Sequence, residues 1–372
     1  MENALPLKVL LVAEGSGGHL IPALEVANAL AKAGARTQLW YAQRAQTAPL
    51  ACALVLASGQ PSVDVSPIPI ERARSLLDRL RHCTQLWSKS QRCFDTFAPD
   101  VVVGFGGWVC APVVLAAKRR GILCVLHEQN VMMGRTNRWL ARWVDRVTVS
   151  FRETQQALRR TPSVVTGMPV REAIGRSSRT VQAARFGFNA TRPTLLVLGG
   201  SQGSQAINRL MLEIVSYLSA EERSQWQVLH ITGMADADRV KEAYARWGLQ
   251  AYVAPYLVDM GAAYAQADLV LGRAGASTVA ELARSGTPAI LIPYPYAGGH
   301  QSANARAVES AGGGIILQER EATPERLLRF LRMLLPDQRV CAEMGSRISS
   351  LAVPDAAQQI TRAIVDVGQG AR

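Results

Sequence analysis

The sequence is poor in aromatic residues and lacks the cysteine spacing of a metal or disulfide scaffold. Phe, Trp and Tyr make up 6% of the 372 residues, whereas hydrophobic residues as a whole make up 48%. This composition is typical of buried parallel strands covered by helices on both faces. No C-x-x-C pair occurs, and we expect reduced, packed thiols, as in a cytosolic protein, at Cys52, Cys83, Cys93, Cys110, Cys124 and Cys341.

No apolar segment is long and unbroken enough to cross a membrane. The uncharged window of residues 101–117 approaches that length, but Gly104, Gly106, Gly107 and Pro112 interrupt it. The first residues also lack the basic region and small-residue cleavage site of a secretory signal. We therefore expect any membrane contact to be peripheral.

The sequence has few charged residues, and their balance is basic. Charged residues make up 19% of the chain, with a formal net charge of +12. Residues 1–170 hold 20 Lys and Arg against 11 Asp and Glu, and residues 171–372 hold 21 against 18. Attraction for anions such as phosphates or acidic lipids is therefore expected mainly in the first half. Zinc-finger spacing and RNA-binding signatures are missing, so nucleic acid is not an expected partner.

Apolar, β-rich runs alternate with helical patterns along the whole chain, which predicts an α/β protein with parallel sheets. The length favours two domains. A break at residues 161–170, punctuated by Pro162, Gly167 and Pro169, separates two series and is the expected hinge. The expected strands are residues 8–13, 37–41, 101–104, 123–127 and 146–149, followed by 194–198, 227–232, 251–254, 269–271 and 289–292.

Three glycine-rich turns each join an expected strand to an expected helix, at residues 14–19, 199–204 and 272–281. Such turns bring backbone N–H groups and a helix N-terminus close to a phosphate. The first turn does not fit a dinucleotide fingerprint, because the third glycine would fall at Leu20 and no acid follows the second strand, so an NAD-dependent oxidoreductase is a weak alternative. The second lacks the Gly-Lys-Ser/Thr of a P-loop.

Polar residues gather at further strand ends. In the third turn, residues 278–281 fit either a helix capping box or a ribose site in which Glu281 accepts both hydroxyls. The loop of residues 293–304 ends in polar side chains that suit sugar hydroxyls, and residues 127–130 read His-Glu-Gln-Asn directly after an apolar strand. Catalytic groups collect at this edge of parallel sheets.

The ordered set of these motifs resembles the peptidoglycan N-acetylglucosaminyltransferases, which convert lipid I into lipid II. The set comprises Gly-Gly-His, His-Glu-Gln-Asn, Gly-Gly-Ser-Gln-Gly, Ala-Gly-Ala-x-Thr-x-x-Glu and Gln-x-x-Asn-Ala, spread over nearly the whole chain. The resemblance implies a GT-B fold, with two Rossmann-like, doubly wound domains and a central cleft. It implies an acceptor and membrane-facing domain at residues 1–166, a UDP-GlcNAc domain at residues 167–351, and a C-terminal helix, residues 352–372, that packs back on the first domain.

The same resemblance implies the roles of individual residues. Glu281 would bind the ribose, the Leu257 backbone would bind the uracil, and Ser201 and Arg171 would lie by the diphosphate. The turn of residues 16–19 would close on the sugar and the acceptor pyrophosphate. The implied UDP-GlcNAc residues are Ser16, Gly17, Gly18, Asn130, Arg171, Ser201, Leu257, Ala276, Ser277, Thr278, Val279, Ala280, Glu281 and Gln301. Departures from the family pattern are Glu14 for Gly, Met168 for Asn, and Trp108, an acceptor-side position, for Tyr.

The expected reaction is a direct displacement with inversion, in which a base takes the proton of the muramyl 4-hydroxyl. His19 is the first choice because an imidazole titrates at about pH 6.5, and Glu128 is the second. We expect no cofactor and no metal, because the single D-x-D motif, at residues 236–238, precedes a helical pattern whose first turn favours acids.

Lipid I and UDP-GlcNAc are the expected substrates, and the cytoplasmic face of the inner membrane is the expected location. There, anionic lipid would attract basic residues. The basic segment of residues 70–92 is expected to face the membrane, although its apolar residues could instead be a stripe that packs in the core. A second basic helix is expected at residues 135–146. A glycosyltransferase with another lipid or antibiotic acceptor, a UDP-GlcNAc 2-epimerase and a binding module remain alternatives. The residues expected to face the membrane are Arg72, Arg74, Leu77, Arg79 and Arg81.

Overall fold

The computed structural model describes residues 6–43, 48–58, 63–70, 75–200 and 202–370. The chain divides into two compact units. Unit 1 contains the described residues up to Val170 together with those from Val353 onward, and unit 2 runs from Arg171 to Ala352. Helix α5, Arg135–Leu140, begins where the helix of residues 135–146 was expected, but the expected end is wrong, because a turn follows Leu140 and the next strand begins at Arg146.

Unit 1 is built on a parallel sheet in the order β3-β2-β1-β4-β5-β6-β7. Strand β1 lies inside the sheet, with β2 and β3 added on one side of it and β4 to β7 on the other. The strand order therefore reverses between β1 and β4, and ligands of open α/β sheets bind at such a switch point. Edge strand β3 was not expected from the sequence, because Pro67 and Pro69 lie in it, and proline is tolerated only at a sheet edge. The strands are β1 Lys8–Glu14, β2 Arg36–Gln43, β3 Val63–Pro69, β4 Val101–Gly104, β5 Leu123–Glu128, β6 Arg146–Val149 and β7 Ser163–Val165.

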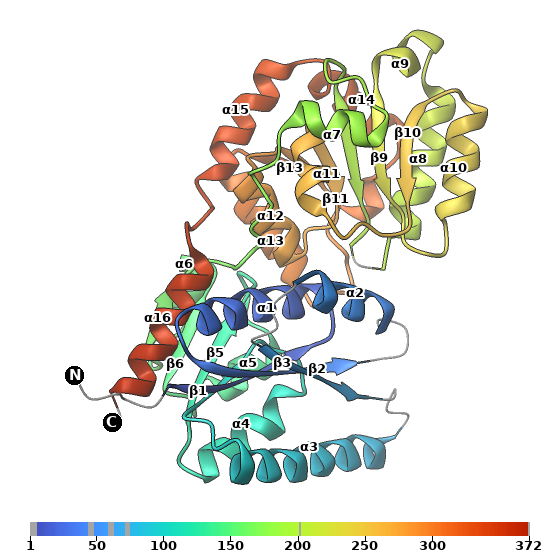
Figure 1. Ribbon diagram of the computed structural model, residues 1–372. Helices are drawn as coiled ribbons and strands as arrows, with labels where there is room; N and C mark the ends of the chain where they lie inside the picture. Colours follow the sequence, from blue (N-terminus) through green and yellow to red (C-terminus); the bar gives the residue numbers. More distant parts are fainter. Residues whose placement is uncertain (1–5, 44–47, 59–62, 71–74, 201, 371–372) are drawn as a thin grey trace. The chain divides into compact units, whose positions relative to one another are not determined.

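Helices cover both faces of this sheet (Figure 1). Alternate residues of β1 point to opposite faces of the sheet, and both faces are apolar. Leu10 and Val12 pack in one core with α4, whereas Val9 and Leu11 pack in a second core with α1 and α16. Helix α16 contacts α1, β4, β5 and β6, so the end of the chain completes unit 1. The helices of unit 1 are α1 Gly17–Lys32, α2 Ala48–Ser58, α3 Leu76–Thr96, α4 Cys110–Arg119, α5 Arg135–Leu140, α6 Arg152–Ala157 and α16 Ala356–Gln369.

Unit 2 has a second parallel sheet, in the order β10-β9-β8-β11-β12-β13, with its switch point between β8 and β11. The predicted α/β class with two parallel sheets is therefore confirmed. The strands are β8 Thr194–Leu198, β9 Gln227–Ile231, β10 Gln250–Ala254, β11 Leu269–Gly272, β12 Ala289–Leu291 and β13 Gly314–Ile316. The helices are α7 Arg179–Phe186, α8 Gln205–Tyr217, α9 Ala220–Gln225, α10 Ala237–Arg246, α11 Met260–Gln266, α12 Ala276–Ser285, α13 His300–Ser310, η1 Glu319–Glu321, α14 Pro324–Leu334 and α15 Gln338–Ser349.

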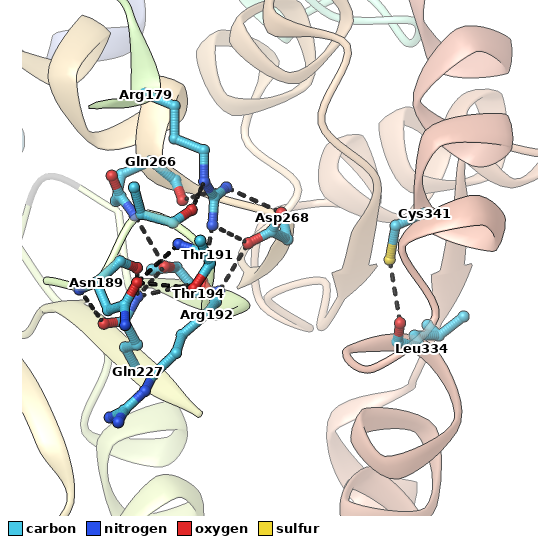
Figure 2. A network of polar contacts seen from close by, with 11 residues as sticks. Arg179, Asn189, Thr191, Arg192, Thr194, Gln227, Gln266, Asp268, Leu334 and Cys341 are labelled. Carbon is cyan, nitrogen blue, oxygen red and sulfur yellow. Dashed lines mark hydrogen bonds and ion pairs between the residues drawn. The ribbon is translucent and has the colours of Figure 1, made fainter. Parts of the chain in front are cut away.

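A polar network closes the amino-terminal edge of this sheet (Figure 2). The Arg179 guanidinium donates to both Asp268 oxygens, at 2.9 and 2.8 Å, and Asp268 also accepts from the Thr194 amide at 2.7 Å. Gln227 donates to the Thr194 hydroxyl and to the Asn189 carbonyl. These contacts join α7 to the first residues of β8 and β11, at the end of the strands opposite to the glycine-rich turns.

Candidate functional site

In unit 1, the turn between β1 and α1 holds His19 in the first turn of the helix. Ser16 is the residue before the helix, and its carbonyl accepts from the amides of His19 and Leu20, at 3.0 and 2.9 Å. The Ser16 hydroxyl lies 2.9 Å from His19 Nδ1. The Ser16 hydroxyl can either donate to or accept from this nitrogen, so the contact holds the imidazole ring in either neutral tautomer.

The turn after β4 adds two glycines beneath these side chains. Gly106 and Gly107 have φ values of +91° and +84°, in the left-handed region that favours glycine. A Cβ at Gly106 would lie 3.0 Å from the His19 ring, and one at Gly107 would collide with the Glu14 carboxylate. Glu14, which departs from the family pattern, therefore occupies space that Gly107 leaves open. Trp108 is half-buried, with its ring 6.1 Å from that of His82 on α3.

The turn after β5 is organised around the Glu128 carboxylate, which is 1% exposed. Its Oε1 accepts from the backbone and side-chain nitrogens of Asn130, at 3.0 and 3.1 Å. Its Oε2 accepts from the Gly134 amide at 3.0 Å and from Asn137 Nδ2 at 2.9 Å. Four donors thus surround Glu128, which ties Asn130 to the start of α5.

The two neighbours of Glu128 are also held by hydrogen bonds within unit 1. His127 is buried, its Nδ1 lies 3.0 Å from the Thr148 hydroxyl, and burial together with the nearby His19 lowers its pKa to about 3. It is therefore neutral at physiological pH. Gln129 donates to the Phe105 carbonyl at 2.7 Å, which joins the β5 turn to the β4 turn. The site residues of unit 1 thus meet at the carboxyl edge of its sheet.

In unit 2, Glu281 and Arg171 form an ion pair. Arg171 donates to Glu281 Oε1 at 3.0 Å and to the Val258 carbonyl at 2.8 Å, and the Glu281 side chain is 7% exposed. Burial by itself lowers the pKa of Arg171, but the charge of Glu281 and its hydrogen bond have a larger effect in the opposite direction. The pKa of Arg171 is therefore raised, and the guanidinium stays charged. Arg171 therefore links Glu281 to Val258, the residue that follows Leu257.

The capping-box alternative for residues 278–281 is wrong. Helix α12 begins at Ala276 with Gly275 before it, so Thr278 and Glu281 lie inside the helix. Ala276, Ser277 and Thr278 form its first turn, where backbone N–H groups have no partner within the helix. The Ser277 hydroxyl oxygen is buried and has no hydrogen-bond partner in the described part of the chain. Val279 and Ala280 follow on the same helix.

The second glycine turn is described except for Ser201, which lies outside the described residues, as do Arg72 and Arg74 in unit 1. Gly203 has a φ of +78°, and a Cβ there would collide with the Thr232 carbonyl. Ser204 caps α8, with its hydroxyl accepting from the Ile207 amide at 3.4 Å. Close backbone packing therefore requires glycine at residue 203.

The loop of residues 293–299 is tied to the third turn. Gln301 Oε1 accepts from the Tyr294 amide at 2.9 Å, and the buried Asn304 side chain donates to the Ala274 carbonyl at 3.1 Å. Gln301 thus lies in the first turn of α13, and Asn304 ties the same helix to the turn that precedes α12.

Sequence reasoning missed several residues that organise the site. Asn137 fixes Glu128, while in unit 2 Asn208 donates to the Thr232 carbonyl and to Asp236, at 2.9 and 2.8 Å. Arg273 is 7% exposed, and its side chain donates to Ser204 Oγ. The sequence signal for Arg273 is that an arginine lies within a glycine-rich turn.

Neither a metal cluster nor a spanning helix is found in the described ranges. No group of three or more His, Cys, Asp or Glu there could hold a metal ion, and Asp236 is taken up by Asn208 and by an ion pair with Arg239 at 2.9 Å. Within the same ranges no helix has the length and apolar character to cross a bilayer.

The two doubly wound units have the architecture of the GT-B fold, and the comparisons with known proteins show that the chain is a GT-B glycosyltransferase. The chain matches the N-terminal domain of glycosyltransferase family 28 over residues 9–149 and the C-terminal domain of that family over residues 194–360. It belongs to the family of UDP-N-acetylglucosamine–N-acetylmuramyl-(pentapeptide) pyrophosphoryl-undecaprenol N-acetylglucosamine transferases.

Individual relatives support this assignment. The transferase of that name from Syntrophotalea carbinolica is 37% identical over 362 residues, which cover 96% of this chain and 98% of the relative. The crystal structure of Acinetobacter baumannii MurG has a TM-score of 0.73 at 29% identity and covers 97% of this chain and 100% of that one. A UDP-GlcNAc 2-epimerase from Neisseria meningitidis has a TM-score of 0.69 at 12% identity, with 97% and 100% covered, and shares the fold alone.

Proposed function

We propose that this protein transfers N-acetylglucosamine from UDP-GlcNAc to the 4-hydroxyl of the N-acetylmuramyl sugar of lipid I, and so forms lipid II. The observation that carries the donor half is the ion pair between Arg171, which precedes α7, and Glu281 on α12. A buried carboxylate can accept both hydroxyls of a ribose, and a helix N-terminus with an arginine beside it favours a diphosphate.

The donor would lie along unit 2. Glu281 binds the ribose, the Leu257 backbone binds the uracil, and Arg171 stabilises the diphosphate as negative charge develops on the leaving UDP. The unpartnered Ser277 hydroxyl supports contacts of Ala276, Ser277 and Thr278 with the sugar or phosphates. Gln301 would bind the N-acetylglucosamine, and Ser201, which lies outside the described residues, would bind phosphate.

The acceptor would bind unit 1, where His19 removes the proton from the attacking hydroxyl and the displacement inverts the anomeric carbon. Gly17 and Gly18 place the helix N-terminus next to the acceptor pyrophosphate. Glu128 is the alternative base, but its four hydrogen bonds favour His19, because the carboxylate would lose some of them to take up a proton.

Unit 1 would also face the membrane. Leu77 and Leu80 on α3 are 76% and 54% exposed, so they are not core residues, and Arg79 and Arg81 beside them are exposed. Trp139 and Trp143 are 44% and 52% exposed. Exposed apolar and indole side chains among arginines suit an anionic lipid surface. These side chains support our proposal that the enzyme acts at the cytoplasmic face of the inner membrane, as a peripheral protein.

Incubation of the purified protein with labelled UDP-GlcNAc and a lipid I analogue tests this function. We expect a labelled disaccharide lipid and equimolar UDP, with a β-configured linkage. A parallel reaction without the lipid tests the epimerase alternative. Formation of N-acetylmannosamine there, with no transfer when lipid I is added, would overturn the proposal.

A further inference from the structure

Arg273 lies at the switch point of the unit 2 sheet. It directly follows β11, whose neighbours are β8 and β12, and its amide donates to the Leu198 carbonyl at the end of β8, at 3.2 Å. The side chain is buried, with 8% of its surface exposed. A buried guanidinium is stable only if its charge and its donors are matched, so its partners indicate its role.

One guanidinium joins three separate segments of the site. Its NH2 group donates to the Ser204 hydroxyl at 3.0 Å, and its NH1 group donates to the Ile292 carbonyl at 3.1 Å. Its charge is paired with Glu319, and it lies 5.3 Å from the centre of the Tyr294 ring. Arg273 therefore connects the N-terminus of α8, the third turn and the loop before α13.

The two helices held in this way, α8 and α12, both begin at this edge of the sheet. Their N-termini carry partial positive charge, and Arg273, whose own charge is paired with Glu319, holds together the turns that precede them. Such an arrangement is favourable when an anion binds there, and the contact with Ser204 fixes the distance between the two turns.

We propose that Arg273 is a positioning residue for the donor diphosphate, which acts by holding Ser204 and the second glycine turn against the start of α12. The inference rests on the proposed function, because it assumes a nucleoside diphosphate as the ligand. The Arg179–Asp268 pair provides a comparison, since it joins the same two strands, β8 and β11, at the opposite edge of the sheet (Figure 2).

The test is titration calorimetry of UDP and of uridine with Arg273→Lys, Arg273→Gln and Ser204→Ala. We expect UDP affinity to fall at least about tenfold, as for the loss of one charged hydrogen bond, while uridine affinity stays unchanged. The KM for UDP-GlcNAc should rise by a similar factor, with a smaller change in kcat. Ser204→Ala removes the acceptor of Arg273 together with the cap of α8, and it should reproduce the selective loss of UDP affinity if Arg273→Gln does not fold.

Arg179→Lys is the matched control. It should lower the unfolding midpoint without changing the ratio of UDP to uridine affinity. Equal losses for UDP and uridine in the Arg273 variants, or a UDP-selective loss in Arg179→Lys, would overturn the positioning role. Absence of UDP binding by the unchanged protein would instead refute the proposed function, so the two failures are distinguishable.

Discussion

Replacement of Glu128 by Gln separates a positioning role from a role as catalytic base. The change retains the shape of the side chain and one acceptor oxygen, but it turns an amide NH2 toward two donors. Two of the four hydrogen bonds to the buried carboxylate are then lost. Hydrogen bonds to a charged group contribute about 1.5–3 kcal/mol each, so the free energy of unfolding should fall by roughly 3 kcal/mol or more.

Asn137→Ala is the companion change, because Asn137 touches Glu128 and the His127 carbonyl, at 2.9 and 3.1 Å, and is 2% exposed. It removes a donor from Glu128 and leaves the carboxylate in place. If Glu128 holds the β5 turn and Asn130, both variants lose stability and kcat/KM together. Glu153→Gln, an exposed glutamate of the same unit, should change stability by no more than about 0.5 kcal/mol.

Urea unfolding and the pH dependence of kcat/KM measure the two roles. With Glu128 as a positioning residue, Glu128→Gln has lower activity but retains the rise in kcat/KM with pH that a histidine base produces, at the same midpoint as in the unchanged protein. The reasoning would be refuted by a Glu128→Gln protein of unchanged stability that has lost this rise and at least about a thousandfold in kcat, with Asn137→Ala unaffected.

Three other predictions follow from the same contacts. Glu281→Ala should weaken UDP binding by about 1.5–3 kcal/mol, measured by calorimetry, whereas exposed Glu309→Gln should not; unchanged UDP affinity in a folded variant would remove the ribose role. Burial lowers the pKa of both His127 and His230 to about 3, so below pH ~6.5 the unfolded chain binds protons that the folded chain does not. As the pH falls below about 6.5, the free energy of unfolding should therefore decrease by up to about 1.4 kcal/mol per pH unit for each histidine. Equal urea midpoints at about pH 7.5 and pH 5.5 would contradict this. Replacing Arg72, Arg74, Arg79 and Arg81 by Gln should weaken sedimentation with anionic vesicles and turnover of lipid acceptor, but not UDP-GlcNAc affinity. The control replaces four exposed arginines of unit 2, namely Arg209, Arg246, Arg306 and Arg329, and an equal loss there would show general charge attraction only.

The fold class could be read from the sequence because local patterns determine it. Buried parallel strands appear as short apolar runs, and glycines mark the turns where each strand meets a helix. Strand β3 and the end of α5 at Leu140 could not be read in this way. A strand that contains proline forms only at the edge of a sheet. A helix ends where neighbouring elements stop covering its apolar side. The rest of the molecule sets both conditions.

The sequence by itself determined which residue types gather at the sheet edges, including His19, Glu128 and Glu281, because the carboxyl ends of parallel strands meet at one edge. The tertiary structure decided what each does there. It paired Glu281 with Arg171 across 110 positions of sequence, surrounded Glu128 with four donors, and brought Arg273 to Ser204 from 69 positions away. Hydrogen bonds between distant segments depend on how the strands are ordered in the sheet, and no local pattern in the sequence carries that order.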